Sequence, residues 1–368
     1  MKEKSNKKMM ILSFIGIVLV VLGHTKNQFQ LASNIFSYYS FHMALFIFIS
    51  GYFYNESNEK NIRKYIFSKF KKLVIPYFIW NIVYGIILLI AKHFNLVIFG
   101  DSFNLYSIFV RPWVDGHQFH LNIASWFILA LFLVNIIYIL FRTLIKKLKL
   151  WNDYVFLIIF LLLSIISVKF SFTNTSRYLI PVLRTGFFMF FYHFGLIYKK
   201  IEKKVNINVL IRLLVIIVVQ LIILKLDSHI SYEVVFMNFN SKYLITPFLG
   251  SITGIMFWLT ISEILVPALK NSKYVNYVSC HTKEIMFHHI FWIFVCNTII
   301  YLLSSTLKLS GFNTDVYMHS VYYCYTAGVP QSAVLYTIVC INIPLLLHYI
   351  YEKKIKNYFR KMVNNEKK

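Results

Sequence analysis

Long runs of apolar residues, separated by shorter polar segments, dominate this 368-residue chain. A helix needs about 20 predominantly apolar residues to cross the hydrocarbon core of a bilayer. Ten stretches approach that length, which predicts an all-α integral membrane protein with a bundle of about ten transmembrane helices. The expected spans are residues 9–25, 33–54, 74–91, 122–141, 153–169, 178–198, 207–226, 244–267, 284–304 and 331–351.

The basic residues between these spans predict their orientation. Of the 38 Lys and Arg residues, 28 fall in the N-terminus, the even-numbered connections and the C-terminus. Lys and Arg concentrate in the cytoplasmic loops of membrane proteins, so both termini are expected in the cytoplasm. The predicted organisation is a single multi-pass domain in the plasma membrane, residues 1–351, followed by a basic cytoplasmic tail, residues 352–368.

Composition and charge narrow the classes of partner. The mean hydropathy is +0.63 and 14% of residues are charged, whereas charged residues make up about a quarter of a soluble domain. The net charge of +24 does not indicate a nucleic-acid partner, because the basic residues lie close to the span ends, where they meet anionic headgroups. We therefore expect contact with membrane lipids. The four cysteines lack metal-ligand spacing, so no metal is predicted.

Two long connections on the predicted outer face combine aromatic with polar residues. They cover about residues 92–121 and 305–330, and they contain His117, His120 and His319. Long ordered loops often carry function, and this composition suits stacking on sugar rings. The alternative interpretation is the belt of aromatic residues that any membrane protein places at the interface.

A basic amphipathic helix is predicted over residues 61–72, on the opposite face. Such a helix lies on the surface of the inner leaflet. The alternative function is a docking surface for a polyanionic donor from the cytosol.

Ionisable side chains inside the spans are few, and they are candidates for function because burying them is costly. The topology and a rise of about 1.5 Å per residue place His24, His42, Trp126 and Arg184 together in the outer third of the membrane, which suggests a cavity open to the outside. The same estimate places three further histidines in the inner third: His193, His288 and His289. No Asp or Glu is expected at mid-membrane, so histidine is the strongest candidate for a buried base near neutral pH.

Several segments together resemble a known family, acyltransferase family 3. The matching segments are GIVLVVLGH (16–24), SFHMALFIFISGYFY (40–54), KFKKLVIPYFIW (69–80) and ASWFILALF (124–132), with looser agreement in FFMFFYHFGLIYKK (187–200) and HTKEIMFHHIF (281–291). The family comprises polytopic membrane enzymes, commonly with ten spans, that transfer acyl groups to hydroxyls of cell-surface glycans. The usual donor is acetyl-CoA.

The resemblance implies roles for individual residues. His24 corresponds to the family's essential first-span histidine, and Lys71 and Lys72 belong to its basic element before a proline. Ser13 occupies the donor-binding position, eleven residues before the histidine, where members typically have Arg or Lys. Either Lys7, Lys8 or the basic helix supplies the missing charge, or the chain has lost affinity for the donor.

These observations predict a membrane O-acetyltransferase that moves an acetyl group from cytosolic acetyl-CoA to a surface or lipid-linked polysaccharide. His24 is the expected general base, while His42, Trp126 and Arg184 are expected to contact the acceptor or to stabilise the oxyanion. Two alternatives stay open at this point. One is a flippase or exporter of lipid-linked glycans that transfers no acyl group; the other is a homologue that has become a sensor or a succinyl transferase.

Overall fold

A computed structural model describes residues 6–25, 34–173, 176–204, 207–228, 230–239, 241–307 and 311–355. Within these ranges the chain forms no strand, and one isolated β-bridge joins Glu233 to Asn238. The predicted all-α class is therefore confirmed. The long helices are α1 (Lys7–His24), α2 (Tyr38–Tyr52), α4 (Ile75–His93), α6 (Trp126–Lys147), α7 (Asp153–Thr173), α8 (Ile180–Ile201), α9 (Val209–Leu226), α10 (Thr246–Ile264), α13 (Thr282–Leu307) and α15 (Ala333–Ile350).

Short helical segments occupy the connections between the long helices. They are η1 (Glu56–Asn61), α3 (Ile62–Lys69), η2 (Phe70–Val74), η3 (Tyr106–Val110), α5 (Arg111–Val114), η4 (Ile123–Ser125), η5 (Arg177–Leu179), α11 (Val266–Leu269), α12 (Lys273–Cys280), α14 (Thr314–His319), η6 (Pro330–Ser332) and η7 (Tyr351–Ile355).

Nine stretches in the described ranges are long and apolar enough to cross a membrane, so the protein is a polytopic membrane protein. The remaining expected span corresponds to α2, which has 15 residues and is shorter than the predicted 33–54. Helices α1, α8 and α10 pack around α2, and irregular backbone at membrane depth is tolerated where protein buries it. Of the predicted basic tail, residues 356–368 lie outside the described ranges.

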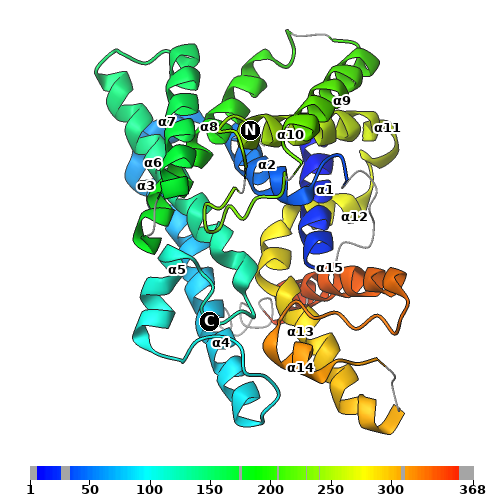
Figure 1. Ribbon diagram of the computed structural model, residues 1–368. Coiled ribbons are helices and arrows are strands. Elements are labelled where there is room, and N and C mark those ends of the chain that lie inside the picture. Colours follow the sequence, from blue (N-terminus) through cyan, green and yellow to red (C-terminus); the bar gives the residue numbers. More distant parts are fainter. Residues whose placement is uncertain are drawn as a thin grey trace, which may run out of the picture.

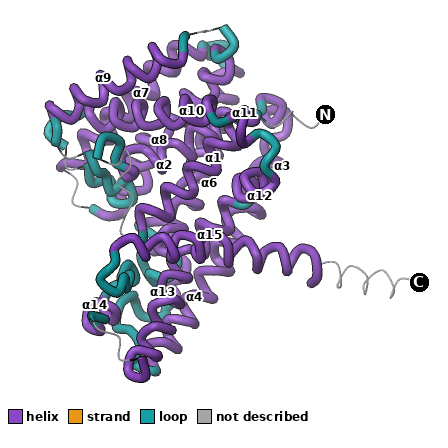
Figure 2. The backbone as a smooth tube through the Cα atoms, turned by 90° about the vertical axis from the view of Figure 1, so that its right-hand side faces the viewer, coloured by secondary structure: helices purple, strands orange, loops and turns teal. Residues whose placement is uncertain are grey.

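Helix α1 links two groups of helices. In Figures 1 and 2, α7, α9 and α10 lie at one end of the molecule and α4, α13 and α14 at the other. Helix α1 packs against α10 of the first group and against α13 of the second, and it also contacts α2 and α15. Its last turn is tied to α15, because the hydroxyls of Thr25 and Thr337 lie 3.0 Å apart.

Two glycines allow α2 and α8 to pack with their backbones in contact. A Cβ atom at Gly51 would overlap the carbonyl oxygen of Tyr192, and one at Gly195 would overlap that of Phe48. Small residues at helix interfaces are a common device of membrane proteins, because close backbone approach maximises packing. Gly51, in the segment 40–54 that resembles the family, therefore lies at a helix contact.

The predicted basic amphipathic segment is helical and largely exposed, as α3 and η2. It continues into α4 without a break, through a π-helical turn over Phe70–Val74. Proline cannot donate the backbone hydrogen bond that an α-helix requires. The wider turn, which ends two residues before Pro76, lies where that bond is missing. The hydroxyl of Tyr65 donates to Asn135 Oδ1 of α6 at 2.7 Å, which fixes α3 against the bundle.

Candidate active site

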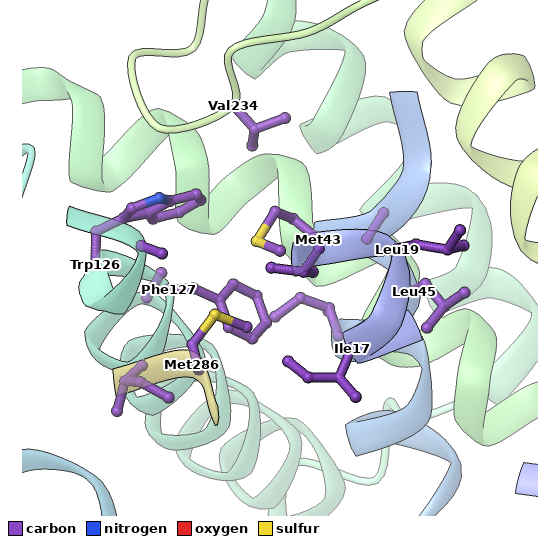
Figure 3. Packing of buried hydrophobic residues seen from close by; sticks show 14 of the residues in the cluster. Ile17, Leu19, Met43, Leu45, Trp126, Phe127, Val234 and Met286 are labelled. Atoms are coloured by element: carbon purple, nitrogen blue, oxygen red, sulfur yellow. The ribbon is translucent and has the colours of Figure 1, made fainter. Parts of the chain in front are cut away.

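A cavity of about 600 Å³ lies beside the C-terminal end of α1. Sites for small molecules usually measure about 300–1,000 Å³. Its walls come from α1, the start of α2, the segment 117–126, the loop 231–236, α13 and the segment 319–322. Figure 3 shows Met43, Trp126, Val234 and Met286 converging on this region from four separate segments.

His24 is the last residue of α1 and lines the cavity. Its ring stacks on Tyr322, with centroids 5.4 Å apart and planes 10° from parallel. The ring of Tyr39 lies edge-on at 6.3 Å. Tyr39 also donates its hydroxyl to the carbonyl oxygen of Gly23 at 2.8 Å, one of the carbonyls that a helix end leaves without an intrahelical partner. The chain thus holds His24 between two tyrosines at the cavity wall.

A second histidine, His289 of α13, lies beside His24, with ring centroids 5.3 Å apart. Its Nδ1 is 2.8 Å from the carbonyl oxygen of Ile285. A carbonyl oxygen only accepts, so Nδ1 carries the proton and Nε2 of the neutral ring has a free lone pair. In the described part of the chain this buried Nε2 has no hydrogen-bond partner. His289 therefore offers an unused acceptor next to His24.

The contact between His24 and His289 corrects the depth expected for His289 from the sequence. The estimate assumed that each span begins level with the others at the inner face. Tyr274 of α12, however, lies against Phe14 in the middle of α1, with ring centroids 6.2 Å apart. Helix α13 follows α12, so it begins part-way along α1 and brings His289 to its far end.

The other two histidines assigned to the inner third, His193 and His288, lie outside the cavity lining and form hydrogen bonds there. His193 Nδ1 bonds with the hydroxyl of Tyr138 and its Nε2 with the carbonyl oxygen of Asp153, both at 2.8 Å. His288 bonds with the hydroxyl of Tyr84, away from the cavity lining. These two histidines have structural contacts.

His42, near the start of α2, lines the same cavity as His24. Its Nδ1 bonds with the carbonyl oxygen of Tyr38 at 2.5 Å, so the proton sits on Nδ1 and Nε2 is left as an acceptor. The fixed tautomers of His42 and His289 mean that both rings present a basic nitrogen without rearrangement.

Both long connections singled out in the sequence contribute to the cavity. His117 and His120 come from the first, and His319 and Tyr322 from the second. Burial lowers the pKa of His117 to about 4, and burial also lowers the pKa of His120. These two loop imidazoles are therefore neutral near pH 7 and serve as hydrogen-bonding groups without charge.

Trp126 lines the cavity, whereas Arg184 lies behind it. The Arg184 guanidinium is 4.8 Å from the centroid of the Trp126 ring. It donates to the carbonyl oxygens of Val235 at 3.1 Å and Val114 at 3.5 Å. Only 1% of Arg184 is exposed. The buried guanidinium thus connects Trp126 with the loop 231–236, and it holds two parts of the wall in place.

Glu233 lines the cavity and was not singled out by the sequence analysis. It is the only carboxylate among the described lining residues, and it is exposed. It lies in a short connection without a recognisable motif, next to residues of ordinary loop composition. No pattern in the sequence distinguishes it, because its position at the cavity wall depends on the path of the loop 231–236.

The residues expected to bind the donor lie away from this cavity. Lys71 and Lys72 are exposed on η2, and the Lys71 ammonium is 4.6 Å from the ring centroid of Phe67. Ser13 is half-buried in the middle of α1. Lys8 is engaged elsewhere, because it forms an ion pair with Glu202 at 2.9 Å. Lys71 and Lys72 thus lie exposed just before α4, outside the cavity lining.

The fold and the cavity define a polytopic helical membrane protein with imidazoles gathered at one end of its first helix. A family model described as an acyltransferase domain, of acyltransferase family 3, matches residues 11–349. The chain belongs to this family, and it is a membrane acyltransferase. The comparisons with curated proteins and with solved structures gave no match.

Proposed function

We propose that this protein is an O-acetyltransferase that moves an acetyl group from cytosolic acetyl-CoA to a hydroxyl of a surface or lipid-linked polysaccharide. The observation that carries the proposal is the placement of His24 on the cavity wall, 5.3 Å between ring centroids from His289. A sugar hydroxyl is a poor nucleophile until a base removes its proton, and a positioned base accelerates such a step by roughly 10²–10⁴-fold.

In the proposed reaction, His24 takes the proton of the acceptor hydroxyl while the oxygen attacks the carbonyl carbon of the thioester. The new carbon–oxygen bond forms a tetrahedral intermediate, the carbon–sulfur bond breaks, and the proton on the imidazolium passes to the departing coenzyme A sulfur. His289 Nε2 is the acceptor that orients His24 and stabilises its charged form. The reaction thus yields the acetyl ester and free coenzyme A, and His24 returns to its neutral form.

The proposed orientation has both termini and η2 on the cytoplasmic side of the plasma membrane, and the concentration of Lys and Arg in these connections supports it. Ser13 lies eleven residues before His24 on the same helix, a distance of about 16 Å. An extended pantetheine arm has a comparable length. In the proposed arrangement, the nucleotide lies near Lys71 and Lys72, and the pantetheine arm carries the thioester to His24.

The test is acetyl transfer from radiolabelled acetyl-CoA, in membranes that contain the full-length protein, to surface polysaccharide from cells of the source strain that lack the gene. The His24→Ala variant is expected to lose about 10²-fold or more in rate. His93→Ala is the matched control, because His93 is exposed at the end of α4 and lies outside the cavity.

Two results would contradict the proposal. If His24→Ala transferred acetyl groups at the wild-type rate, the base would be assigned wrongly. If the wild-type protein moved lipid-linked glycan across proteoliposomes without acetylating it, the protein would be a flippase.

A further inference from the structure

A second, smaller cavity lies next to the first. It measures about 240 Å³, and Phe236 lines both. The polar side chains in its walls belong to Asp115, Ser171, Ser176 and Arg177. Its volume is below the usual range for a whole small-molecule ligand, about 300–1,000 Å³. The cavity therefore suits one compact unit of a larger ligand that also occupies its neighbour.

The polar groups of the small cavity include both donors and acceptors. Asp115 Oδ1 accepts from Arg111 Nε at 3.1 Å and from the backbone N–H of His117 at 3.0 Å. Both hydrogen bonds go to the same oxygen, so Oδ2 is available to a ligand. Arg177 is exposed, and a guanidinium has five donors and no acceptor. A hydroxyl both donates and accepts, so this combination fits a ring that carries several hydroxyls.

Phe236 forms the boundary between the two cavities. The residue is 39% exposed, and the centroid of its ring lies 4.6 Å from that of His117, edge to face. The backbone around it is fixed, because Glu233 and Asn238 form a β-bridge and Arg184 holds the carbonyl oxygen of Val235. An exposed aromatic ring on a fixed loop provides a flat apolar surface, as a chain of sugars crossing between two sites requires.

We infer that the small cavity is a second acceptor subsite, which binds the sugar unit next to the one that is acetylated. The inference rests on the proposed function and adds a second binding position for its polysaccharide, formed by residues outside the first cavity. Phe236 supports the linkage between the two units, while Asp115 Oδ2 and Arg177 bind hydroxyls of the second.

The experiment uses the purified full-length protein with radiolabelled acetyl-CoA. The acceptors are fragments of the polysaccharide from gene-deleted cells, partially hydrolysed and separated into single sugars, disaccharides and tetrasaccharides. The wild type is expected to show kcat/KM about tenfold higher for disaccharide than for single sugar, as charged hydrogen bonds in a second subsite would give. Arg177→Ala is expected to lose most of that ratio. Lys242→Ala, an exposed basic residue outside both cavities, should keep it.

The outcomes separate the inference from the function on which it rests. Acetylation of all fragments with equal kcat/KM by the wild type would overturn the second subsite and leave the proposed function intact. An unchanged ratio in Arg177→Ala would do the same. Absence of transfer to every fragment by a correctly folded protein would overturn both. If Arg177→Ala does not fold, as judged by gel filtration, Arg177→Gln replaces it in the same comparison.

Discussion

The imidazoles of His24 and His289 lie with their ring centroids 5.3 Å apart, and the Nε2 atom of His289 has no hydrogen-bond partner in the described structure. A buried acceptor without a partner costs free energy of folding. In the proposed reaction, this acceptor would stabilise His24 when its imidazole takes up a proton.

Replacing His289 should therefore impair catalysis more than folding. His289→Ala and His289→Asn are both expected to lower kcat by about 10²-fold, within the range for a group that assists proton transfer. The Asn side chain can donate the hydrogen bond to the carbonyl oxygen of Ile285, but it has no acceptor at the position of His289 Nε2. His348→Ala, whose ring contacts His281 outside the cavity, is the control. Full activity in His289→Asn would show that only the bond to Ile285 matters.

Arg184 is expected to control affinity for the acceptor. Arg184→Lys keeps the charge but loses the planar fork that holds the carbonyl oxygens of Val235 and Val114. Because Trp126 and the loop 231–236 would loosen, KM for the polysaccharide should rise by about tenfold, as expected for loss of a charged hydrogen bond. KM for acetyl-CoA should stay constant. A rise in KM for acetyl-CoA alone would place Arg184 on the donor path instead.

Lys71 and Lys72 are expected to attract the donor phosphates. Substitution of both by Ala should raise KM for acetyl-CoA, and the difference from wild type should shrink at high salt, because interactions between exposed charges are screened. Lys169→Ala removes an exposed charge from the far end of α7 and serves as the control. An effect that did not depend on salt would contradict an electrostatic role.

Gly51→Ala should destabilise the protein, although alanine is the better helix former. The added Cβ atom would overlap the carbonyl oxygen of Tyr192 and push α2 away from α8. Overpacking typically costs about 1–3 kcal/mol, which thermal unfolding in detergent would reveal as a lower Tm. At Gly250, also helical, an added Cβ would lie at an ordinary 3.4 Å from the Tyr232 hydroxyl. Gly250→Ala should leave Tm unchanged or raise it, and equal effects at both sites would refute the packing argument.

The pKa of His117 predicts how stability changes with pH. Burial lowers this pKa from 6.5 to about 4, so between these values the unfolded chain binds more protons than the folded one. The free energy of unfolding therefore falls as the pH falls through this window. His117→Gln removes the contribution, and its Tm should decrease less than that of the wild type between about pH 7 and about pH 5. His93→Gln is the control, because it tests whether replacing a histidine elsewhere changes the pH dependence of Tm in the same way.

The sequence predicted the all-α class, which the structure confirms, and it pointed to His24, which lies on the cavity wall, but it did not predict that His289 lies beside it. Apolar length, basic connections and the family pattern are local properties, so they identify spans and single residues. The position of His289 depends on how α12 packs against Phe14, which is a contact between distant segments. The sequence did not single out Glu233 for a similar reason. This residue lies in a loop whose path is set by Arg184 and by the bridge to Asn238.

The unbroken helix formed by α3, η2 and α4 has a structural consequence. Its first part lies exposed and basic, while Trp80 further along contacts His288, with ring centroids 4.3 Å apart. His288 precedes His289 on α13. The continuous helix therefore joins the exposed basic surface and the contact with α13 in one structural element, whose position is fixed by the hydrogen bond from Tyr65 to Asn135 of α6.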